Sequence, residues 1–482
     1  MSSNRLNAAR NYELEHKDLI EAAVRPVFHF TSPIGWLNDP NGFSEYAGSY
    51  HLFFQYHPYS LTWGPMHWGH AVSKDFINWQ YLPCALAPDT EYDSGGCFSG
   101  SAFTNKDGAH VLAYTNVHEK ADATYQEQSL AIGDGLNYEK LSENPILSKE
   151  DLPKQYSAID FRDPKVSLDE NGNYNMVTVS GKQDNLGAIL LFKSKDGKDF
   201  KFISELAANQ GNLGVMWECP DLFNLDGEDI LIFSAQSYEN KALNYQGDAC
   251  FYMQGEFYGE NFRASKLNRL DYGYDFYAPQ TLKTEDGRRV MIAWMQNWQN
   301  KDAASEDALY FGQMTCPREL VFEDNELKQK PVRELKDLRK NQRSFSCKDF
   351  SGEQELTEFS SKIFDLELQL KSKTDELNGF KLELYEDLYL EYSSQSQKLK
   401  LYRSLEAAKK TDMQNVYCDL SDINSELSLR ILKDRNSLEI FINGGKKTIT
   451  ALLENRAEKA SLKFSSKENV DLEASIWDLE KD

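Results

Sequence analysis

Short runs of β-branched and aromatic residues follow one another along most of the chain, and each run ends at Gly, Asn, Asp or Pro. This pattern is typical of β-strands bounded by turns. Between residues 27 and 320 the longer periodicity of amphipathic helices is missing. We therefore predict an all-β fold for this region. The predicted strands span residues 50–56, 109–114, 174–179, 188–192, 229–233, 250–253 and 289–294.

Several of the segments between these runs have the composition of tight hairpin turns. Residues 169–172, 195–198 and 285–288 each carry Asn-Gly or Asp-Gly, which tolerate the positive φ of such turns. A long region of short strands suits a β-propeller or a large β-sandwich. No exact sequence repeat marks individual blades, so the pattern alone leaves both architectures open.

The first part of the chain divides into two expected segments. Residues 1–25 are polar and form an N-terminal helical appendage, with a helix over residues 11–24 that ends before Pro26. Residues 26–330 form the first all-β domain. A chain of 482 residues exceeds what one hydrophobic core usually serves, so a second domain is expected.

The second part of the chain begins with a charged stretch. Residues 331–344 read as a short helical linker. Beyond it, apolar and polar residues alternate strictly, as in an antiparallel sheet with one face in the core and one in water. We predict a β-sandwich over residues 345–482. The clearest alternating runs are residues 364–370, 380–384 and 427–431.

Composition narrows the possible partners. The formal net charge is −23, which repels nucleic acid and anionic membranes, so neither is expected to bind. The N-terminus has no apolar signal sequence and no run is long enough to span a membrane. The seven cysteines are scattered without a C-x-x-C pair. They indicate reduced thiols in a cytoplasmic protein rather than a disulfide framework or a zinc site.

Three carboxylates lie in stiff, aromatic or Pro-bounded segments. Asp39 lies between Asn38 and Pro40 within residues 36–42, where Asn41-Gly42 predicts a tight turn. Cleavage of a glycosidic bond needs two carboxyl groups, one to attack or activate water and one to donate a proton. The other candidates are Asp163, in residues 160–164, and Glu218, in residues 216–221.

Each carboxylate also has a simpler interpretation. Asp39 could form an Asx-type turn, Asp163 could pair with Arg162 at the surface, and Glu218 could be an exposed loop acid. Trp217 and Cys219 favour a half-buried Glu218, where desolvation raises a carboxyl pKa and suits a proton donor. Three such acids on one β domain predict a site where the loops of a propeller converge.

Aromatic and polar residues gather near these acids. They provide ring faces for sugar C–H groups and polar groups for hydroxyls, although some of the tryptophans would simply pack in a core. The histidines lack a further ligand at metal-binding spacing, so no metal is expected. The residues concerned are Gln55, His57, Trp63, His67, Trp68, His70, Phe98 and Ser99.

Several long motifs in order resemble the invertases and fructan hydrolases of glycoside hydrolase family 32. Residues 36–42 look like the nucleophile motif of that family, residues 161–164 like its transition-state-stabiliser motif, and residues 217–221 like its acid/base motif. The likeness runs from about residue 26 to the C-terminus. Further matching segments are residues 52–56, 68–71, 98–101, 275–280, 317–320 and 438–443.

The resemblance implies a five-bladed β-propeller followed by a C-terminal β-sandwich. It also implies a retaining mechanism without a cofactor. Asp39 would attack the fructosyl anomeric carbon, Glu218 would act as acid and base, and Asp163 would hold fructose hydroxyls. The expected substrate is a small neutral saccharide. The residues implied to bind it are Asn38, Gln55, Trp63, Phe98, Ser99, Arg162, Tyr277 and Trp294.

Alternatives stay open at this level. Sucrose and short fructooligosaccharides are the favoured substrates, while a sucrose-6-phosphate hydrolase and a fructosyltransferase would use the same acids. A catalytically silent sugar-binding propeller would usually have lost one of the three carboxylates. An arabinan-type glycosidase fits the propeller architecture but not the Asn-Asp-Pro-Asn-Gly sequence of residues 38–42. The second domain could cover the propeller side or mediate a homodimer.

Overall fold

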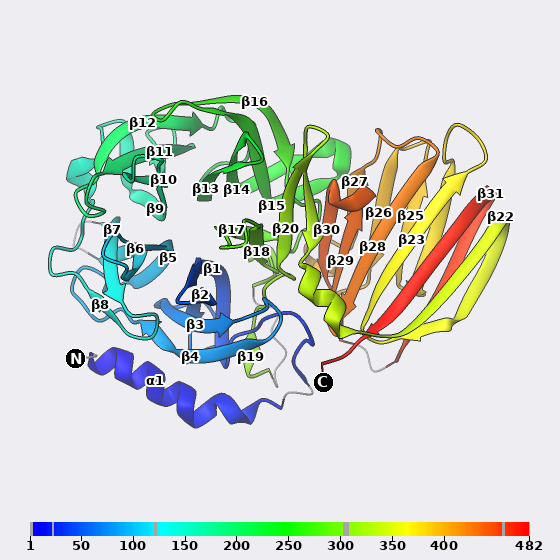
Figure 1. The fold of residues 1–482 in the computed structure, drawn as a ribbon, viewed down its shortest axis with the longest axis horizontal. Coiled ribbons are helices and arrows are strands. Elements are labelled where there is room, and N and C mark those ends of the chain that lie inside the picture. Colours follow the sequence, from blue (N-terminus) through cyan, green and yellow to red (C-terminus); the bar gives the residue numbers. More distant parts are fainter. Residues whose placement is uncertain (1–2, 22–23, 120–122, 302–307, 456–457, 482) are drawn as a thin grey trace.

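Strands make up most of the computed structural model, which describes residues 3–21, 24–119, 123–301, 308–455 and 458–481. Two bodies lie side by side: a ring of sheets formed by the first two thirds of the chain, and a stack of long strands formed by the last third (Figure 1). Within the described residues the ring contains five sheets arranged as blades. The predicted fold class, a five-bladed β-propeller followed by a β-sandwich, is confirmed.

The five blades follow the chain in order. The first contains β19 (Tyr310–Phe311), β1 (Gly35–Tyr46), β2 (Ser49–His57), β3 (His67–Ser73) and β4 (Trp79–Leu86). The second contains β5 (Gly96–Thr104), β6 (His110–Glu119), β7 (Thr124–Gly133) and β8 (Tyr138–Lys140). The third contains β9 (Tyr156–Leu168), β10 (Tyr174–Lys182), β11 (Gly187–Ser194) and β12 (Lys201–Ala208). The fourth contains β13 (Trp217–Leu225), β14 (Glu228–Asn240), β15 (Tyr245–Phe257) and β16 (Phe262–Arg269). The fifth contains β17 (Tyr277–Lys283), β18 (Arg289–Trp294), β20 (Arg318–Glu323) and β21 (Glu326–Pro331).

The strands β1, β5, β9, β13 and β17 surround the axis of the ring and contact one another in turn. Each carries a β-bulge. In β1, β9, β13 and β17 two residues oppose one residue of the neighbouring strand, and in β5 Ser99 is the extra residue. A bulge bends a strand and redirects its side chains. The doubled residues are 38–39, 163–164, 219–220 and 278–279.

Proline follows a left-handed residue in three of these bulges. Asp163, Cys219 and Ala278 have φ of 63°, 51° and 51°, and each precedes a proline. Pro cannot donate to a β-ladder and is therefore confined, inside sheets, to edges and bulges. A positive φ at a non-glycine residue is strained and persists where the surrounding structure enforces it, commonly at functional sites.

The tight turn predicted at Asn41-Gly42 is wrong. Residues 36–42 lie wholly inside strand β1, which continues to Tyr46 before it turns. Gly42 does have a positive φ of 52°, but it lies in a second irregularity of the ladder between Asn41 and Ser44. Pro40 and Gly42 here lie at bulges in a buried strand rather than in a turn, because a bulge needs the same backbone freedom as a turn.

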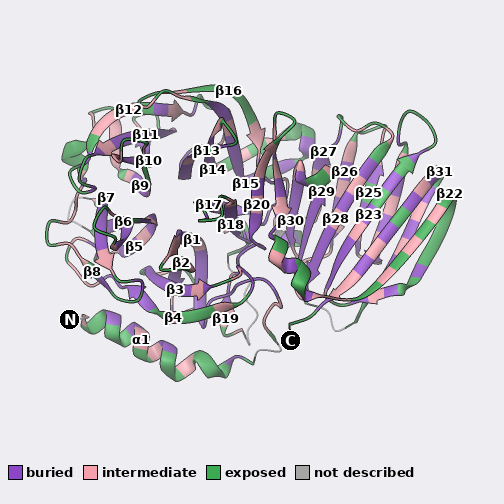
Figure 2. Ribbon diagram, in the orientation of Figure 1, coloured by how far each residue is buried: buried purple, intermediate pink, exposed green. Residues whose placement is uncertain are grey.

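The sandwich is one continuous ten-stranded sheet in its hydrogen bonds, and its two halves share one long strand pair. β22 (Arg339–Ser361) and β31 (Ala460–Leu479) pair with each other along their length. Residues 463–466 of β31 pair with β24, whereas residues 470–478 pair with β23. The remaining strands are β23 (Phe364–Ser372), β24 (Gly379–Tyr385), β25 (Leu388–Ser393), β26 (Lys398–Arg403), β27 (Asn415–Asp419), β28 (Glu426–Asp434), β29 (Ser437–Ile442) and β30 (Lys447–Leu452). Buried residues alternate with less buried ones along β24 and β26, as the sequence predicts, whereas β29 is buried throughout (Figure 2).

The predicted linker is shorter than expected. Residues 333–338 form the 3₁₀ helix η6 (Arg333–Leu338), and residues 339–344 already belong to β22, which pairs with the end of β31 from Arg339 onward. The other short helices are η1 (Lys17–Leu19), η3 (Lys149–Asp151), η4 (Lys241–Leu243), η5 (Trp298–Asn300), α2 (Glu406–Lys410) and η7 (Asn443–Gly445). None of the helices within the described ranges is long and apolar enough to cross a membrane.

The N-terminal helix α1 (Asn4–His16) is displaced from its predicted range. It starts earlier because the Ser3 side chain caps it, accepting a hydrogen bond from Leu6 N at 3.0 Å. It ends at His16, and residues 22 and 23 of the predicted helix lie outside the described residues. Glu13 accepts from Cys84 N at 3.0 Å, and Arg10 donates to Cys84 O at 2.9 Å. The helix thereby covers the open edge of β4.

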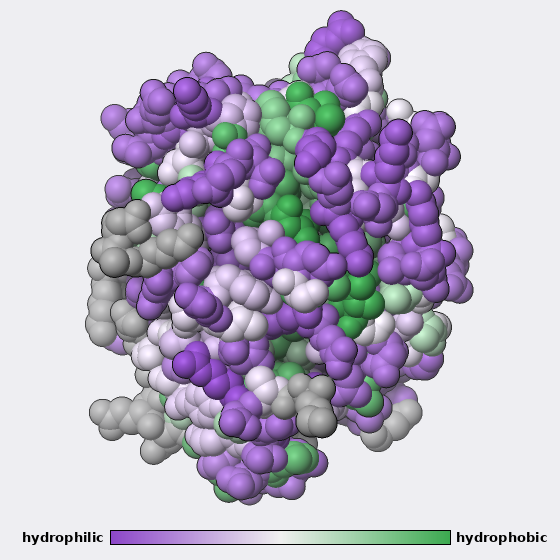
Figure 3. All heavy atoms as spheres, turned by 90° about the vertical axis from the view of Figure 1, so that its left-hand side faces the viewer, coloured by the Kyte–Doolittle hydropathy of each residue, from purple (hydrophilic) through white to green (hydrophobic). Residues whose placement is uncertain are grey.

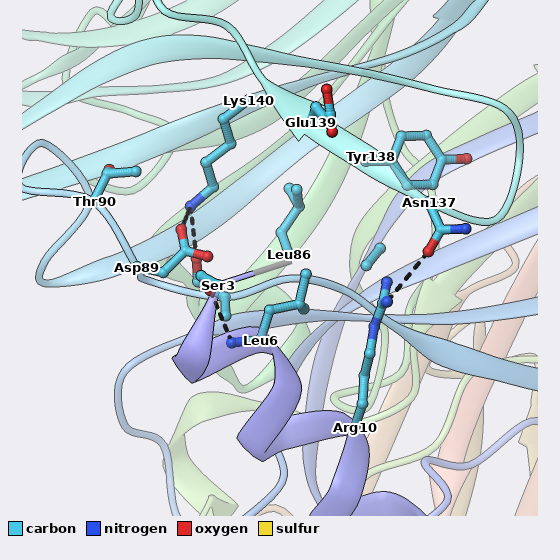
Figure 4. Close-up of a pocket in the computed structure, with 12 residues that line it drawn as sticks. Ser3, Leu6, Arg10, Leu86, Asp89, Thr90, Asn137, Tyr138, Glu139 and Lys140 are labelled. Atoms are coloured by element: carbon cyan, nitrogen blue, oxygen red, sulfur yellow. Dashed lines mark hydrogen bonds and ion pairs between the residues drawn. The ribbon is translucent and has the colours of Figure 1, made fainter. Parts of the chain in front are cut away.

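A cavity of about 560 Å³ lies between α1 and the first two blades. Figure 4 shows Lys140 directed at Asp89 and Arg10 directed at Asn137 across it. The outer face of the propeller is mainly hydrophilic, with a band of hydrophobic residues between hydrophilic flanks (Figure 3). This surface agrees with the high net charge of the chain.

Buried charges join the propeller to the sandwich. His29 donates from Nδ1 to Asp434 Oδ2 at 3.0 Å and from Nε2 to Glu439 Oε1 at 2.9 Å, and all three side chains are fully buried. Arg318 bonds Asp271 of the propeller at 3.0 Å and also bonds Glu439. Buried charges are tolerated only when paired and hydrogen-bonded, so these contacts fix how the two bodies dock.

The His29 contacts predict a pH-dependent stability. Burial alone would lower the pKa of His29, but its bonds to Asp434 and Glu439 raise the pKa to about 9. A raised pKa stabilises the fold below the unfolded value of 6.5 and loses that effect as the pH rises through about 9. We expect His29→Gln to lower the free energy of unfolding by about 3 kcal/mol at pH 6 and by much less above pH 9.

Urea unfolding of the wild type and the variant between pH 6 and pH 10 measures this difference. His118→Gln is the matched control, because His118 is partly exposed and lies 4.0 Å from a single carboxylate. A difference between wild type and His29→Gln that stays constant across the pH range would contradict the assignment.

Candidate active site

Asp39 lies in the bulge of β1 and is held by two side chains. Ser99 Oγ donates to Asp39 Oδ2 at 2.6 Å, and Asn38 Nδ2 donates to Asp39 Oδ1 at 3.0 Å. Asn38 is itself oriented by Trp36, whose Nε1 donates to Asn38 Oδ1 at 2.7 Å. Both carboxylate oxygens of Asp39 therefore have a fixed partner, and the group cannot rotate freely.

Asp163 lies in the bulge of β9 and faces the bulge of β13. Its Oδ2 accepts from Cys219 N at 2.9 Å, and its own backbone N–H donates to Thr115 Oγ1 at 2.9 Å. The Cys219 thiol lies 3.6 Å from Asp163 Oδ2 and 3.8 Å from Asp39 Oδ2. Residues from three blades thus meet at one end of the inner strands, around two carboxylates.

Glu218 precedes Cys219 and is half-buried. Arg162 donates to Glu218 Oε1 from Nε at 3.2 Å and from Nη2 at 3.0 Å. The Tyr277 hydroxyl donates to the other oxygen, Oε2. Arg162 also donates to Asp160 Oδ1 at 2.9 Å and lies 3.9 Å from Asp163 Oδ2. The Arg162 guanidinium therefore interacts with three carboxylates, those of Glu218, Asp160 and Asp163.

The simple interpretation of Asp163 as half of a surface ion pair is wrong. Arg162 and Asp163 are only 8% and 6% exposed, and the shorter contacts of Arg162 go to Glu218 and Asp160. The bulge redirects Asp163 toward the axis, whereas sequence adjacency suggested a pair at the surface. The exposed-acid interpretation of Glu218 is wrong too, because both of its oxygens are bonded by buried residues.

Burial shapes the electrostatics of this cluster. Burial, with a further contribution from the charge of Glu218, raises the pKa of Asp39 to about 6, although the Ser99 and Asn38 hydrogen bonds oppose the shift. Burial also raises the pKa of Asp163, against the effect of Arg162. Burial, followed by the charges of Asp163 and Asp39, raises the pKa of the Cys219 thiol, so it stays protonated. Perturbed carboxylates in one cluster are typical of active sites.

An aromatic layer supports the cluster from the side of the first and last blades. Trp36 stacks on Phe311 with ring centroids 4.9 Å apart and packs against Trp298 at 6.2 Å. Trp294 packs against Trp298 at 5.0 Å and has no exposed surface. This layer fixes Trp36, and through it the Asn38 amide beside Asp39.

Three further predicted residues, Gln55, Phe98 and Trp63, connect to the cluster beside Ser99. Gln55 opposes the bulge of β1 and donates to Cys97 O at 3.0 Å, which places it next to Phe98 and Ser99. Trp63 is 46% exposed and meets the Phe98 ring edge-to-face at 5.7 Å. An exposed tryptophan in a rigid contact provides a flat apolar surface for a ligand.

Sequence reasoning missed some residues of the site. Cys219 contacts both Asp39 and Asp163. Its position directly after Glu218 is the sequence feature that could have identified it as a site residue. Thr115 and Gln126 hold Asp163 and Arg162 from the second blade, and no local motif marks either one. No cluster of three or more His, Cys, Asp or Glu side chains within the described ranges could hold a metal ion.

Known proteins resemble this chain along its whole length. Residues 29–331 match the description "Glycosyl hydrolases family 32 N-terminal domain", and residues 334–478 match "Glycosyl hydrolases family 32 C terminal". An Escherichia coli sucrose-6-phosphate hydrolase is 33% identical over 99% of this chain and 100% of its own length. An Escherichia coli raffinose invertase is 34% identical over 91% of each chain.

Solved structures agree. A mutant of a Bombyx mori GH32 beta-fructofuranosidase, determined in complex with sucrose, superposes with a TM-score of 0.82 and 30% identity over 100% of this chain and 99% of that chain. Its fold and the family models cover both the propeller and the sandwich. On this evidence, together with the three carboxylates at the centre of the propeller, the chain belongs to glycoside hydrolase family 32.

Proposed function

We propose that this protein is a retaining β-fructofuranosidase, which releases terminal non-reducing β-D-fructofuranosyl residues from sucrose and short fructooligosaccharides. The observation that carries the proposal is the convergence of Asp39, Asp163 and Glu218 from three blades onto one end of the propeller axis. Two carboxyl groups that flank a glycosidic bond are what both steps of a retaining mechanism require.

In the first step Asp39 attacks the anomeric carbon of the fructosyl unit. It suits this role because two donors fix it, and because a pKa of about 6 leaves it ionised at neutral pH. Glu218 donates a proton to the leaving oxygen. Tyr277 and Arg162 hold its two oxygens and so direct the carboxyl group toward the bond.

In the second step Glu218 acts as a base toward water, which releases fructose and restores Asp39. Asp163 holds fructose hydroxyls, and its fixed backbone N–H contact to Thr115 keeps it in place. The proposed substrate-binding residues are Asn38, Gln55, Trp63, Phe98, Ser99, Arg162, Tyr277 and Trp294.

Sucrose 6-phosphate hydrolysis is the second candidate. The names of the relatives support it, since sucrose-6-phosphate hydrolases and a raffinose invertase are similar to this chain at nearly equal identity. A fructosyltransferase would use the same acids with a sugar in place of water.

We further propose a cytoplasmic location. A homodimer formed through the sandwich is a separate hypothesis. It would be wrong if light scattering showed that the fully active protein is a monomer.

Substitution of the two catalytic carboxylates tests the proposal. Asp39→Asn and Glu218→Gln should each reduce kcat for fructose release on the order of 10³-fold, because each removes one half of the mechanism. An aryl β-D-fructofuranoside, whose phenolate leaves without protonation, should restore much of the first step in Glu218→Gln but not in Asp39→Asn.

The measurement is reducing-sugar release from sucrose, sucrose 6-phosphate, a short fructooligosaccharide, inulin and levan. Asp160→Asn is the control, since Asp160 touches Arg162 but is half-exposed. A ranking led by sucrose 6-phosphate would select the second candidate. Wild-type activity that survives in Asp39→Asn would eliminate both.

The pKa of Asp39 predicts the acid limb of the pH profile. Asp39 must be ionised to attack, so kcat/KM should fall as the pH drops through about 6. Ser99→Ala removes a hydrogen bond that favours the ionised form, so the midpoint should move to higher pH.

Initial rates between pH 4 and pH 8 measure the midpoint in both proteins. Ser129→Ala is the control, because Ser129 is buried and bonded to Asn116, away from the carboxylates. An unchanged midpoint in Ser99→Ala would show that another group controls this limb.

A further inference from the structure

The contact between the sandwich and the propeller includes one buried ion pair close to the active site. Arg403, at the end of β26, bonds Asp275 in the loop that leads into β17. Arg403 is 1% exposed and Asp275 is 0% exposed. The pair therefore lies at the interface of the two bodies, 128 residues apart in sequence and sealed from water.

Asp275 accepts three hydrogen bonds from side-chain and backbone donors. Its Oδ2 accepts from Arg403 Nη1 and from Leu452 N, the latter at 2.7 Å, and both donors belong to the sandwich. Its Oδ1 accepts from Asn297 Nδ2 at 2.6 Å in the propeller. Arg403 also donates to Leu452 O at 2.8 Å, so the guanidinium is itself held in place.

One path from Asp275 leads to the acid/base residue. Asp275 stands two positions before Tyr277 at the start of β17, and the Tyr277 hydroxyl donates to Glu218. The intervening residue, Phe276, is buried against the Arg318 guanidinium at 4.9 Å. This short stretch has little freedom, so a shift of Asp275 moves the Tyr277 hydroxyl.

A second path leads to the nucleophile. Asn297 caps η5 through its side chain, which accepts from Asn300 N at 3.0 Å. The first residue of η5 is Trp298, which packs against Trp294 and Trp36. Trp36 then donates to Asn38, and Asn38 donates to Asp39. Each link is a hydrogen bond, a packed ring pair or, between Asn297 and Trp298, the peptide chain itself.

We propose that Arg403 is a positioning residue of the active site, through which the sandwich holds Asp275 and thereby orients both catalytic carboxylates. The inference rests on the proposed roles of Asp39 and Glu218. It gives the second domain a part in catalysis, although the described sandwich residues contribute no bond to the three site carboxylates.

Loss of Arg403 would change the geometry of the active site, because Asp275 would lose its buried counter-ion. Removing one partner of a buried ion pair leaves an uncompensated charge, which the structure relieves by local movement or hydration. Asp275 would then draw water or shift toward its remaining donors, Leu452 N and Asn297. Misplacement of catalytic groups by about 1 Å can cost roughly 100-fold in rate.

A merely structural role is the competing explanation, and the sandwich offers a matched control. Arg430 bonds Asp365 at 3.0 Å and 2.8 Å, and Asp365 is fully buried. Both residues belong to the sandwich, on β28 and β23, and neither touches the propeller loop before β17. Arg430→Gln therefore removes one ion pair of a buried sandwich aspartate, which keeps its second pair with Arg339 at 2.7 Å, and it offers no path to the three site carboxylates.

The experiment compares Arg403→Gln, Arg430→Gln and wild type for kcat, KM, the acid limb of the pH profile and the melting temperature. In Arg403→Gln we expect kcat to fall roughly 10- to 100-fold while KM changes little. Its acid limb should move to higher pH, because a loosened Asn38 no longer favours the ionised form of Asp39. Arg430→Gln should melt earlier but keep the wild-type kcat and acid limb.

Asp275→Asn extends the test and covers a failure of Arg403→Gln to fold. It keeps the shape of the side chain and removes the charge, so it should reproduce the kinetic change. In the double variant Arg403→Gln/Asp275→Asn the loss of kcat should equal that of a single variant, since both act through one contact.

Wild-type kcat and acid limb in Arg403→Gln or in Asp275→Asn would overturn the proposal, as would equal kinetic effects in Arg430→Gln. Full additivity in the double variant would overturn it as well. An inactive wild type would instead count against the proposed function, and the two failures are therefore distinguishable.

Discussion

The burial of several carboxylates around a single guanidinium is the constraint on which the site depends. Asp39, Asp163 and Glu218 lie close together, and Arg162 is the cation among them. Like charges in a low-dielectric setting repel strongly, so each acid needs dedicated hydrogen-bond donors. Ser99, Asn38, Tyr277 and the backbone of Cys219 supply those donors, and each is held in turn by neighbouring strands. The raised pKa of Asp39 shows that these donors do not fully offset the free-energy cost of burying its negative charge.

The bulged inner strands meet this constraint geometrically. A regular strand directs alternate side chains to opposite faces of its sheet, so it could not aim neighbouring groups at the propeller axis. The bulges of β1, β5 and β9 contain Asp39, Ser99 and Asp163, whereas Glu218 and Tyr277 directly precede the bulges of β13 and β17. In β9, β13 and β17 a left-handed residue before a proline fixes the bend. The same device in every blade explains how one architecture brings groups from separate blades to one place.

The sandwich extends the constraint beyond the propeller. The two bodies meet through buried ion pairs around His29, Arg318 and Arg403, rather than through apolar contact alone. Such pairs specify one docking geometry, because any other arrangement would leave a buried charge without a partner. The loop that carries Asp275 belongs to this interface and also to the fifth blade, so the docking of the domains and the geometry of the site are linked in a single segment.

The sequence by itself determined the all-β class, the positions of seven propeller strands, the alternating strands of the sandwich and the three carboxylates. These follow from local pattern, since hydrophobic periodicity and Pro-bounded acids are readable without tertiary contacts. It also placed a turn at Asn41-Gly42 and a helix at residues 11–24, because the same Pro, Gly and polar residues serve turns, bulges and helix ends. Only the tertiary structure decided that Arg162 serves Glu218, that Cys219 contacts both aspartates and that Arg403 holds Asp275. Those contacts join residues 56 to 180 positions apart, and their burial and pairing depend on how distant strands converge.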